Sequence, residues 1–428
     1  MKRRQFVTLP AGLALFPLGL FVSSYGYASL GDRAVVWGGT GFNVPNDEIK
    51  VRLERVNRSL EARGQAGWKL WIDALFANLK TGFNGVITNG PGMKIEYESD
   101  PGLIFSLGFD YENFLRIDIL PGELPGSDAD GKRDISFYYL FSSIRVYSVK
   151  LPRQRKGQIN LVYSQPVKAF NRAMLDATDN SEDDFVLETL MSDADYTTLS
   201  KFKALVGRIS VDESFFEPRH LRVRSARISS EAQSTLSSLK LNKGFNPNFF
   251  ASMIGVSANQ SFEASVLPFV MTDYLSSTLR SRFDKEPEIG AIFKDMDDDV
   301  ASYYVDFSVN KVLRKISAEN ASKQQIARGL AMDISFINSI DNSVIFKTTL
   351  VRVEKREQVK GAREESWYRS NDSLYFYYVI EKMIGDFFEG IKLSDPQLLK
   401  NSGVRPQDTT QKDLQMVKSL LESCRYGA

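Results

Sequence analysis

The sequence predicts an α+β protein with two domains of antiparallel or mixed sheet covered by helices, and one further helix at the C-terminus. Two separate regions alternate apolar and polar residues with the period of two that is typical of strands. Segments with apolar residues at helical spacing accompany both regions, and no regular βαβ alternation indicates a doubly wound sheet. With 428 residues, of which 43% are hydrophobic, the chain is long enough for two or three domains.

The N-terminus predicts a signal peptide over residues 1–28. Three basic residues, Lys2–Arg4, precede an apolar stretch over 9–22, and small residues stand at the −3 and −1 positions of a cleavage after Ala28. The pair Arg3–Arg4 also resembles a twin-arginine signal, so that export route, ordinary unfolded export and an uncleaved anchor all stay open. On each interpretation the body of the chain is expected outside the cytoplasm, in the periplasm or cell envelope.

The composition limits the chemistry that is expected. Lys and Arg total 54 against 53 Asp and Glu, so the chain lacks the overall basic charge of a nucleic-acid-binding protein. A single cysteine, Cys424, excludes intrachain disulfides and Cys-rich metal sites, which fits an exported chain that avoids cysteine. A single histidine, His220, excludes sites built on histidine pairs. No cofactor is expected.

The first α+β domain is predicted over 46–200, after a flexible mature N-terminus at 29–45. A change of apolar parity at Ser142–Ser143 predicts a bulge within one of its strands. The expected elements of this domain are two amphipathic helices over 47–63 and 68–79, strands over 103–109, 115–119, 135–146 and 159–163, and a more helical, acidic segment over 169–195.

Residues 201–254 are predicted to connect the domains, and 255–392 to form the second α+β domain. A polar linker and an amphipathic helix are expected over 393–428, where Cys424 is interpreted as a buried small hydrophobe. The elements expected here are strands over 219–228, 262–266, 303–309, 326–336 and 344–353, helices over 249–254, 271–283 and 374–391, and a turn at Asp341–Asn342.

The segment Val35–Phe42, with sequence VVWGGTGF, resembles the glycine-rich opening of Rossmann enzymes such as the nucleotide-sugar epimerases. In those enzymes the glycines let the backbone approach a pyrophosphate at a helix N-terminus. Here Asn43–Asn46 intervenes before any helix, and the third glycine is missing. Dinucleotide binding is therefore not expected.

Weak candidates for a metal site are Asp295, Asp297 and Asp299, whose carboxylates could hold calcium. The spacing of an EF-hand is absent, so solvated loop acids are the preferred interpretation and no metal is expected. His220 stands among arginines that lower its proton affinity, and no GxSxG motif supplies a nucleophile. We therefore interpret His220 as a surface residue and predict no catalytic residue.

Candidate interaction residues lie in two small basic patches. A contact with anionic lipid or polymer of the cell envelope is the functional interpretation of these patches, and a solvated surface is the alternative. The patches consist of Arg153, Arg155 and Lys156 in one predicted turn, and of Arg222 and Arg224 in one predicted strand.

Residues 262–391 resemble the α+β domain of the curli-secretion protein CsgG and of its relatives, the amino-terminal domain of TolB and the envelope lipoproteins LpoB and PelC. The matching features are Val266–Phe269 before a helix, the strand over 303–309, the hairpin around 340–346 and the closing helix over 374–391. The resemblance implies a periplasmic or outer-membrane-associated, non-enzymatic subunit that assembles into rings or complexes. It implies no catalytic residues.

The sequence thus predicts a non-enzymatic exported envelope protein, a structural or accessory subunit of a secretion, surface-appendage or polysaccharide-export assembly. Its expected partners are other envelope proteins in a homo- or hetero-oligomer, contacted through strand edges and helix faces, with the outer membrane or a polysaccharide as a further contact and no nucleic acid. The alternatives are an exported hydrolase that uses a carboxylate pair, and a periplasmic protein that binds polysaccharide or a small ligand.

Overall fold

The structure is a computed structural model, in which two sheets and their helices are described. The residues described are 35–42, 44, 46–62, 102–119, 133–150, 158–176, 181–192, 194–208, 219–238, 247–262, 266–267, 301–359, 362–404 and 409–424. The predicted helices over 68–79 and 271–283 lie outside these ranges.

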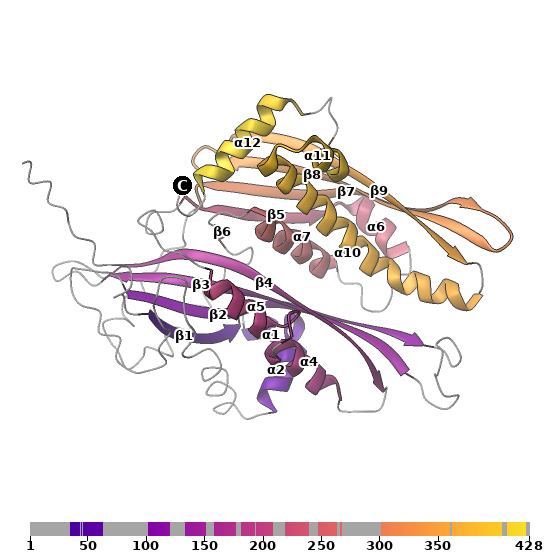
Figure 1. The fold of residues 1–428 in the computed structure, drawn as a ribbon, viewed down its shortest axis with the longest axis horizontal. Helices are drawn as coiled ribbons and strands as arrows, with labels where there is room; N and C mark the ends of the chain where they lie inside the picture. The colour runs from indigo at the N-terminus through magenta and orange to yellow at the C-terminus, as the bar shows by residue number, and fades with distance from the viewer. Residues whose placement is uncertain are drawn as a thin grey trace, which may run out of the picture.

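The first sheet has four strands in the order β1-β2-β3-β4 (Figure 1). The short strand β1 (Val35–Phe42) runs parallel to β2 (Gly102–Ile119). The strands β3 (Arg133–Lys150) and β4 (Gln158–Asp176) then continue as an antiparallel meander. Glycine and threonine in β1 do not prevent it from pairing, because backbone groups form the ladder between β1 and residues 103–109 of β2.

The second sheet has five strands in the order β6-β5-β7-β8-β9. The strand β5 (Leu221–Ile228) is parallel to β7 (Tyr303–Glu319) and to the two-residue β6 (Val266–Leu267). The long strands β8 (Lys323–Asn338) and β9 (Val344–Val359) complete an antiparallel meander with β7.

Helices connect and follow the strands in both halves. The helix α12 begins with a capping box in which Thr410 and Asp413 exchange hydrogen bonds. The helices are α1 (Asn46–Arg52), α2 (Glu54–Glu61), α4 (Ser181–Met191), α5 (Thr198–Val206), α6 (Ser230–Ser238), α7 (Pro247–Phe262), α10 (Ala362–Leu393), α11 (Pro396–Ser402) and α12 (Gln411–Ser423).

Apart from the two-residue β6, which belongs to the second sheet alone, the described parts of the two sheets have the same topology. In each, a short strand lies parallel to a long one, two described helices separate them in sequence, an antiparallel meander follows, and helices close the unit. Three irregularities also coincide: register shifts occur at Trp37/Gly39 and Val223/Ser225, at Phe109/Tyr111 and Val309/Lys311, and at Val146/Tyr147 and Phe336/Ile337. A further shift, at Ile316/Ala318, occurs in the second sheet without a counterpart in the first. The described chain is therefore a tandem repeat, which we call the first unit (35–208) and the second unit (219–424).

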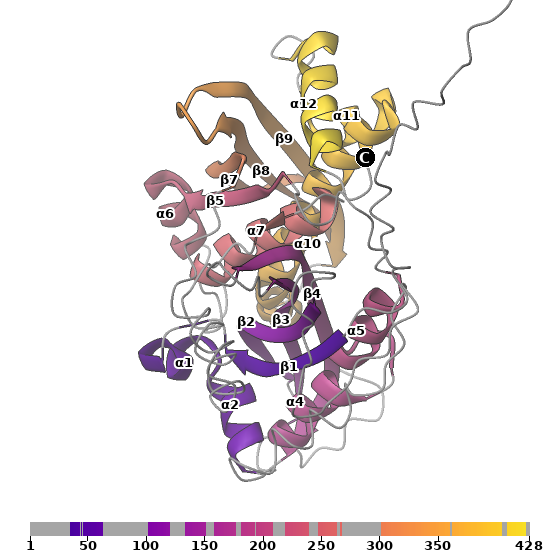
Figure 2. The same ribbon diagram turned by 90° about the vertical axis from the view of Figure 1, so that its left-hand side faces the viewer.

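The two units stack in the same orientation, as alternating sheet and helix layers (Figures 1 and 2). The inner face of the first sheet packs on α1, α2, α4 and α5 in one apolar core. The outer face of the first sheet packs on α7 and α10 of the second unit, within the second core. Each sheet thus has one face on its own helices, and the first sheet has its other face on the helices of the next unit.

The predicted α+β class is confirmed, together with the turn at Asp341–Asn342, where Asn342 has a left-handed φ of 56°. The helix predicted over 374–391 lies within the longer α10. The strand β5 and helices α6 and α7 occupy the range expected to connect two domains. The strand β1 likewise occupies part of the range expected to be flexible, because both short strands pair with distant long ones.

Two local predictions were wrong. The residue Phe262 ends helix α7 and does not begin a strand. The bulge predicted at Ser142–Ser143 is not in β3: the register shifts on the partner strand, between Phe109 and Tyr111, opposite Ser142 and Phe141. The apolar parity changes along β3 because the structure buries both of its faces, first against α10 and then against the inner helices.

Candidate functional site

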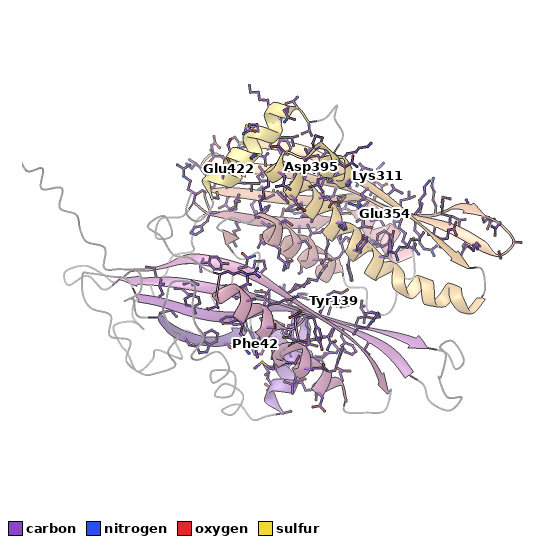
Figure 3. The ribbon with its side chains drawn as sticks, viewed as in Figure 1. Phe42, Tyr139, Lys311, Glu354, Asp395 and Glu422 are labelled. Carbon is purple, nitrogen blue, oxygen red and sulfur yellow. The ribbon has the colours of Figure 1, made fainter. Side chains whose placement is uncertain are left out.

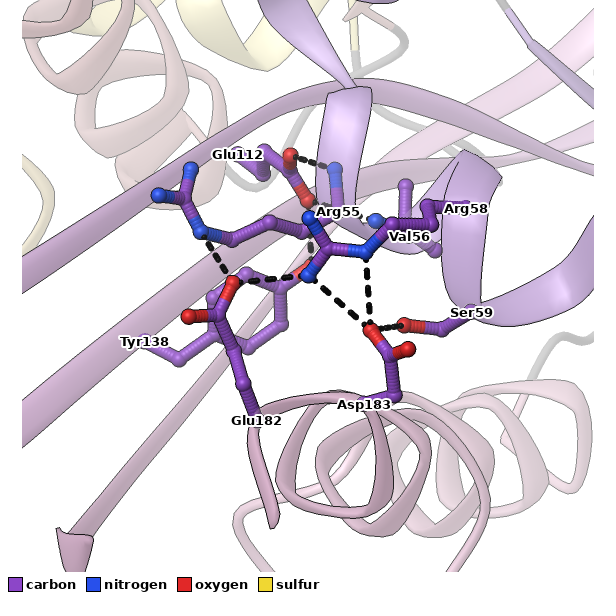
Figure 4. Close-up of polar contacts among 8 residues, drawn as sticks. All are labelled: Arg55, Val56, Arg58, Ser59, Glu112, Tyr138, Glu182 and Asp183. Atoms are coloured by element: carbon purple, nitrogen blue, oxygen red, sulfur yellow. Dashed lines mark hydrogen bonds and ion pairs between the residues drawn. The ribbon is translucent and has the colours of Figure 1, made fainter. Parts of the chain in front are cut away.

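A buried carboxylate joins the first sheet to helix α2 (Figure 4). The side chain of Glu112 on β2 is 7% exposed and accepts hydrogen bonds from the backbone N–H groups of Arg55 (2.5 Å) and Val56 (3.0 Å) and from the hydroxyl of Tyr138 (2.6 Å). The N-cap residue of α2, Leu53, has no side-chain acceptor, so Glu112 caps this helix from another element. Burial raises the pKa of Glu112, and these three hydrogen bonds oppose the rise.

A second group of polar contacts connects α2 to α4 near Glu112 (Figure 4). The guanidinium of Arg58 binds Glu182 (2.9 Å) and Asp183 (3.0 Å), and Asp183 also accepts a hydrogen bond from Ser59 (2.9 Å). The pKa of Arg58 is raised, first by its hydrogen bond to Glu182. All of these groups take their partners from the protein itself, so the cluster acts as a brace between two helices and a strand.

Polar and aromatic contacts also join the two units. The ammonium of Lys168 on β4 forms an ion pair with Glu381 on α10, and lies 5.7 Å from the ring centre of Tyr139. The ring of Tyr139 in turn meets Tyr377 of α10 edge-on, with centroids 6.1 Å apart (Figure 3). Burial, followed by the nearby charge of Lys201, lowers the pKa of Lys168 to about 8. This contact fixes α10 on the outer face of the first sheet.

The residue Arg145 is a buried charge that nothing in the sequence indicated. It lies on β3 between Ser106 of β2 and Ser164 of β4, and it is 3% exposed. Within the described part of the chain, its Nε and Nη2 atoms have no hydrogen-bond partner, and neither has Ser106 Oγ. The alternating pattern of β3 predicts which face of the strand is apolar. A single polar residue on the opposite face, such as Arg145, is then predicted to be exposed to solvent.

The histidine His220 lies just before β5 and is not the surface residue that was predicted. Its backbone oxygen accepts hydrogen bonds from Ser302 (2.8 Å) and Tyr303 (3.2 Å). The side chain is partly buried, and burial lowers its pKa to about 4, while a hydrogen bond to the backbone of Leu161 acts in the opposite direction. The sequence suggested that neighbouring arginines lower the pKa of His220, but burial is what lowers it in the structure.

This histidine should make stability depend on pH. Because its pKa is about 4 in the folded protein and 6.5 in an unfolded chain, the unfolded state binds more protons between these values. The unfolding free energy should therefore fall by up to about 3 kcal/mol as the pH is lowered through this window. Urea unfolding at several pH values should give a flatter curve for His220→Gln than for the wild type. Parallel curves for the two proteins would contradict this prediction.

Among the described elements, no helix layer covers the outer face of the second sheet, in contrast to that of the first sheet. Directly paired residues of neighbouring strands share a face, so three rows across β7, β8 and β9 define a surface that we call the lysine face. Figure 3 labels Lys311, at one corner of it. The rows are Lys311, Ala331 and Val351; Leu313, Gly329 and Val353; and Lys315, Ala327 and Lys355.

The repeat allows the lysine face to be compared with the equivalent, covered face of the first sheet. There the matching positions are largely aromatic and pack on α7 and α10. The register shifts align Tyr111 with Lys311, Asn113 with Leu313, Leu115 with Lys315, Phe137 with Ala327, Tyr139 with Gly329, Phe141 with Ala331, Lys168 with Val351, Phe170 with Val353 and Arg172 with Lys355. Lysine, alanine or glycine thus replaces a large apolar side chain at five of the nine positions. Cations also occur on the covered face, at Lys168 and Arg172.

Of the predicted interaction residues, Arg224 forms its polar contacts within the protein. Its guanidinium binds both oxygens of Asp306 (2.5 and 3.1 Å) and Asn342 (3.3 Å), and lies over the ring of Tyr304. Its neighbour Arg222 pairs with Leu267 of β6, at the edge of the sheet. The residues Arg153, Arg155 and Lys156, and the candidate calcium ligands Asp295, Asp297 and Asp299, lie outside the described residues.

The remaining predicted features have structural roles. The glycine-rich segment forms strand β1, which pairs with strand β2. Within β1, Gly39 adopts a φ of 103° at a register shift. The thiol of Cys424 is buried in the second core, which raises its pKa to about 11. In the described ranges, no group of three or more His, Cys, Asp or Glu side chains could hold a metal ion, and no helix is long and apolar enough to cross a membrane.

No family model matches this chain, and no curated protein is similar to it in sequence. Among solved structures, a DUF330 protein from Xanthomonas campestris aligns over 42% of this chain and 88% of its own, with 10% identity and a TM-score of 0.20. A putative neuraminyllactose-binding hemagglutinin homologue from Helicobacter pylori aligns over 43% and 92% (9% identity, TM-score 0.20). Lipoprotein GNA1162 from Neisseria meningitidis aligns over 38% and 99% (9%, 0.15). At these TM-scores the likenesses assign neither a family nor a function.

Proposed function

We propose that this chain is a non-enzymatic exported envelope protein, a structural or accessory subunit of a secretion, surface-appendage or polysaccharide-export assembly. On this proposal, two stacked units form one scaffold that presents the lysine face to a partner. The observation that carries the proposal is the replacement of five large apolar residues of the first sheet by lysine, alanine or glycine at the equivalent positions of the second sheet. An open sheet face with its own distinct chemistry is a surface for binding.

Three further features support the proposal. The signal-peptide pattern over 1–28 favours export, and the resemblance of 262–391 to the CsgG and TolB amino-terminal domains favours an envelope subunit. Two buried ionisable groups also serve the architecture: Glu112 caps a helix, and Lys168 joins the two units. These roles suit a molecule that acts through shape and contact.

Cell fractionation and position-specific cross-linking test the proposal. The full chain should be recovered outside the cytoplasm with its N-terminus at Ser29, as a cleavage after Ala28 requires. A photo-reactive residue at position 315, on the lysine face, should cross-link within intact envelopes, and the same residue at the exposed position 382 of α10 should not. A full-length chain resident in the cytoplasm, or equal cross-linking from both positions, would overturn the proposed function.

A further inference from the structure

We propose that the partner of the lysine face is the surface of an anionic lipid bilayer. This inference rests on the proposed function, because it identifies the chemistry that the presented face recognises. It concerns the nine residues of the three rows across β7, β8 and β9, and it depends on their charge and their apolar centre.

The charge of the lysine face is of one sign. The side chains of Lys311, Lys315 and Lys355 are exposed, and the other six residues of the face are uncharged. Two acids lie in the adjoining rows of the same face, and each has a lysine partner. Asp333 on β8 accepts a hydrogen bond from Thr349 (2.6 Å) and lies 3.8 Å from Lys347, and Glu357 on β9 lies 3.4 Å from Lys323. The nine residues themselves thus carry three cations and no acid, which favours an anionic partner.

The centre of the lysine face is apolar. The exposed fractions of Leu313 and Val353 are 37% and 48%, and they flank Gly329 in the middle row. A Cβ on Gly329 would lie 2.8 Å from Val353 Cγ2, so glycine is what allows that side chain to lie across the strand. Between the two outer lysines, Ala327 is only 1% exposed, as expected if the aliphatic stems cover it.

A surface with lysine ammonium groups around exposed Leu and Val side chains fits the interface of a bilayer. Lipid phosphates attract the ammonium groups, at about 1 kcal/mol for each basic residue, while the acyl boundary accepts the apolar side chains. A single-stranded nucleic acid would favour aromatic side chains for stacking, and a discrete phosphate would favour an arginine fork. The nine residues include neither an aromatic residue nor an arginine.

Vesicle flotation with the whole mature protein tests this inference. The wild type should partition onto vesicles that contain about one third phosphatidylglycerol, and not onto pure phosphatidylcholine. The triple variant Lys311→Gln, Lys315→Gln, Lys355→Gln should bind about 100-fold more weakly. The matched control removes three exposed lysines from the helices α10, α11 and α12 (Lys382→Gln, Lys400→Gln, Lys412→Gln) and should bind within about threefold of wild type, because those lysines are not on the face.

Several outcomes would overturn the inference. They are a wild type that does not bind anionic vesicles, a face variant that binds like wild type, and a control variant that loses as much affinity as the face variant. Equal binding to soluble polyphosphate or duplex DNA would also overturn it, since the face would then recognise charge without a bilayer. Circular dichroism of both variants should match wild type. Cross-linking from position 315 to protein partners alone would keep the proposed function while removing this inference.

Discussion

Replacing Gly403 by alanine is expected to destabilise the protein by about 3–5 kcal/mol. The residue ends helix α11 with a left-handed φ of 88°, which alanine adopts only at a cost. A Cβ at this position would lie 2.1 Å from the carbonyl oxygen of Val351 and 2.8 Å from its nitrogen. Both atoms belong to the backbone of β9, so neither can move without disturbing the strand.

The backbone around Gly403 holds the C-terminal segment on the edge of the second sheet. The carbonyl of Gly403 accepts a hydrogen bond from Val351 N (3.0 Å), and Val404 forms a bridge with Leu350. The hydroxyls of Thr348 and Thr409 bond at 2.6 Å. The segment therefore covers part of an otherwise unpaired strand edge, and its loss should expose both β9 and α12.

Urea unfolding and hydrogen exchange of Gly403→Ala measure this effect, with exchange expected to rise in β9, α11 and α12. The matched control is Gly385→Ala, at a position inside α10 where a Cβ would meet no atom within 4 Å. That substitution should stabilise the helix by about 0.5–1 kcal/mol. A Gly403→Ala protein within 1 kcal/mol of wild type would contradict the expected clash.

Replacing Glu112 by alanine should lower the unfolding free energy by about 3–5 kcal/mol. The carboxylate accepts two backbone hydrogen bonds at the start of α2 and one from Tyr138. Without it, the N–H groups of Arg55 and Val56 and a buried hydroxyl lose their acceptors, and leaving buried donors unpaired is costly. Chemical denaturation of the variant measures the loss.

Two variants separate this role from a general effect of removing an acid. The change Glu61→Ala, at an exposed position of the same helix, should alter stability by no more than about 0.5 kcal/mol. In a double-mutant cycle, Tyr138→Phe should cost much less when Glu112 is already absent, because the two groups share a hydrogen bond. Equal costs in both backgrounds would show that the contact contributes nothing.

The fold class and many elements could be predicted because local pattern determines them. Alternating residues along β7 and β8, the apolar stripe of α10 and the Asp341–Asn342 turn each follow from a period or a turn preference within one segment. The buried thiol of Cys424 follows in the same way from its place on an amphipathic stripe. In each case neighbours in the sequence hold the information.

The interpretation of β3 illustrates where local pattern misleads. Its change of parity near Ser142 looks like an extra residue in the strand, but the extra residue is Asp110 on the partner strand. Two layers cover the two faces of β3 over different lengths, so the apolar residues change sides along a continuous strand. A pattern on one strand reports which faces are buried, without reporting which partner strand bends.

The candidate site depended still more on tertiary structure. The sequence pointed to Arg222 and Arg224 as a basic patch, but Asp306, which is 82 positions away from Arg224 in the chain, takes up the Arg224 guanidinium. It gave no reason to single out Lys311, Lys315 and Lys355, since an isolated lysine on a strand is ordinary. Their importance appears only when pairing places them on one face.

By itself, the sequence determined the α+β class, a pattern for export, and a composition poor in the side chains that metal and nucleophilic chemistry require. Periodicity and composition are properties of neighbouring or summed residues, so no three-dimensional information was needed. Only the tertiary structure decided that the described chain is a stacked repeat, that Glu112 caps a helix more than fifty residues away, and that no described helix covers one face of the second sheet. Such facts arise from contacts between segments that are distant in the sequence. The two units can share strand order and bulge positions despite little sequence similarity, because backbone pairing determines these features and side-chain identity does not.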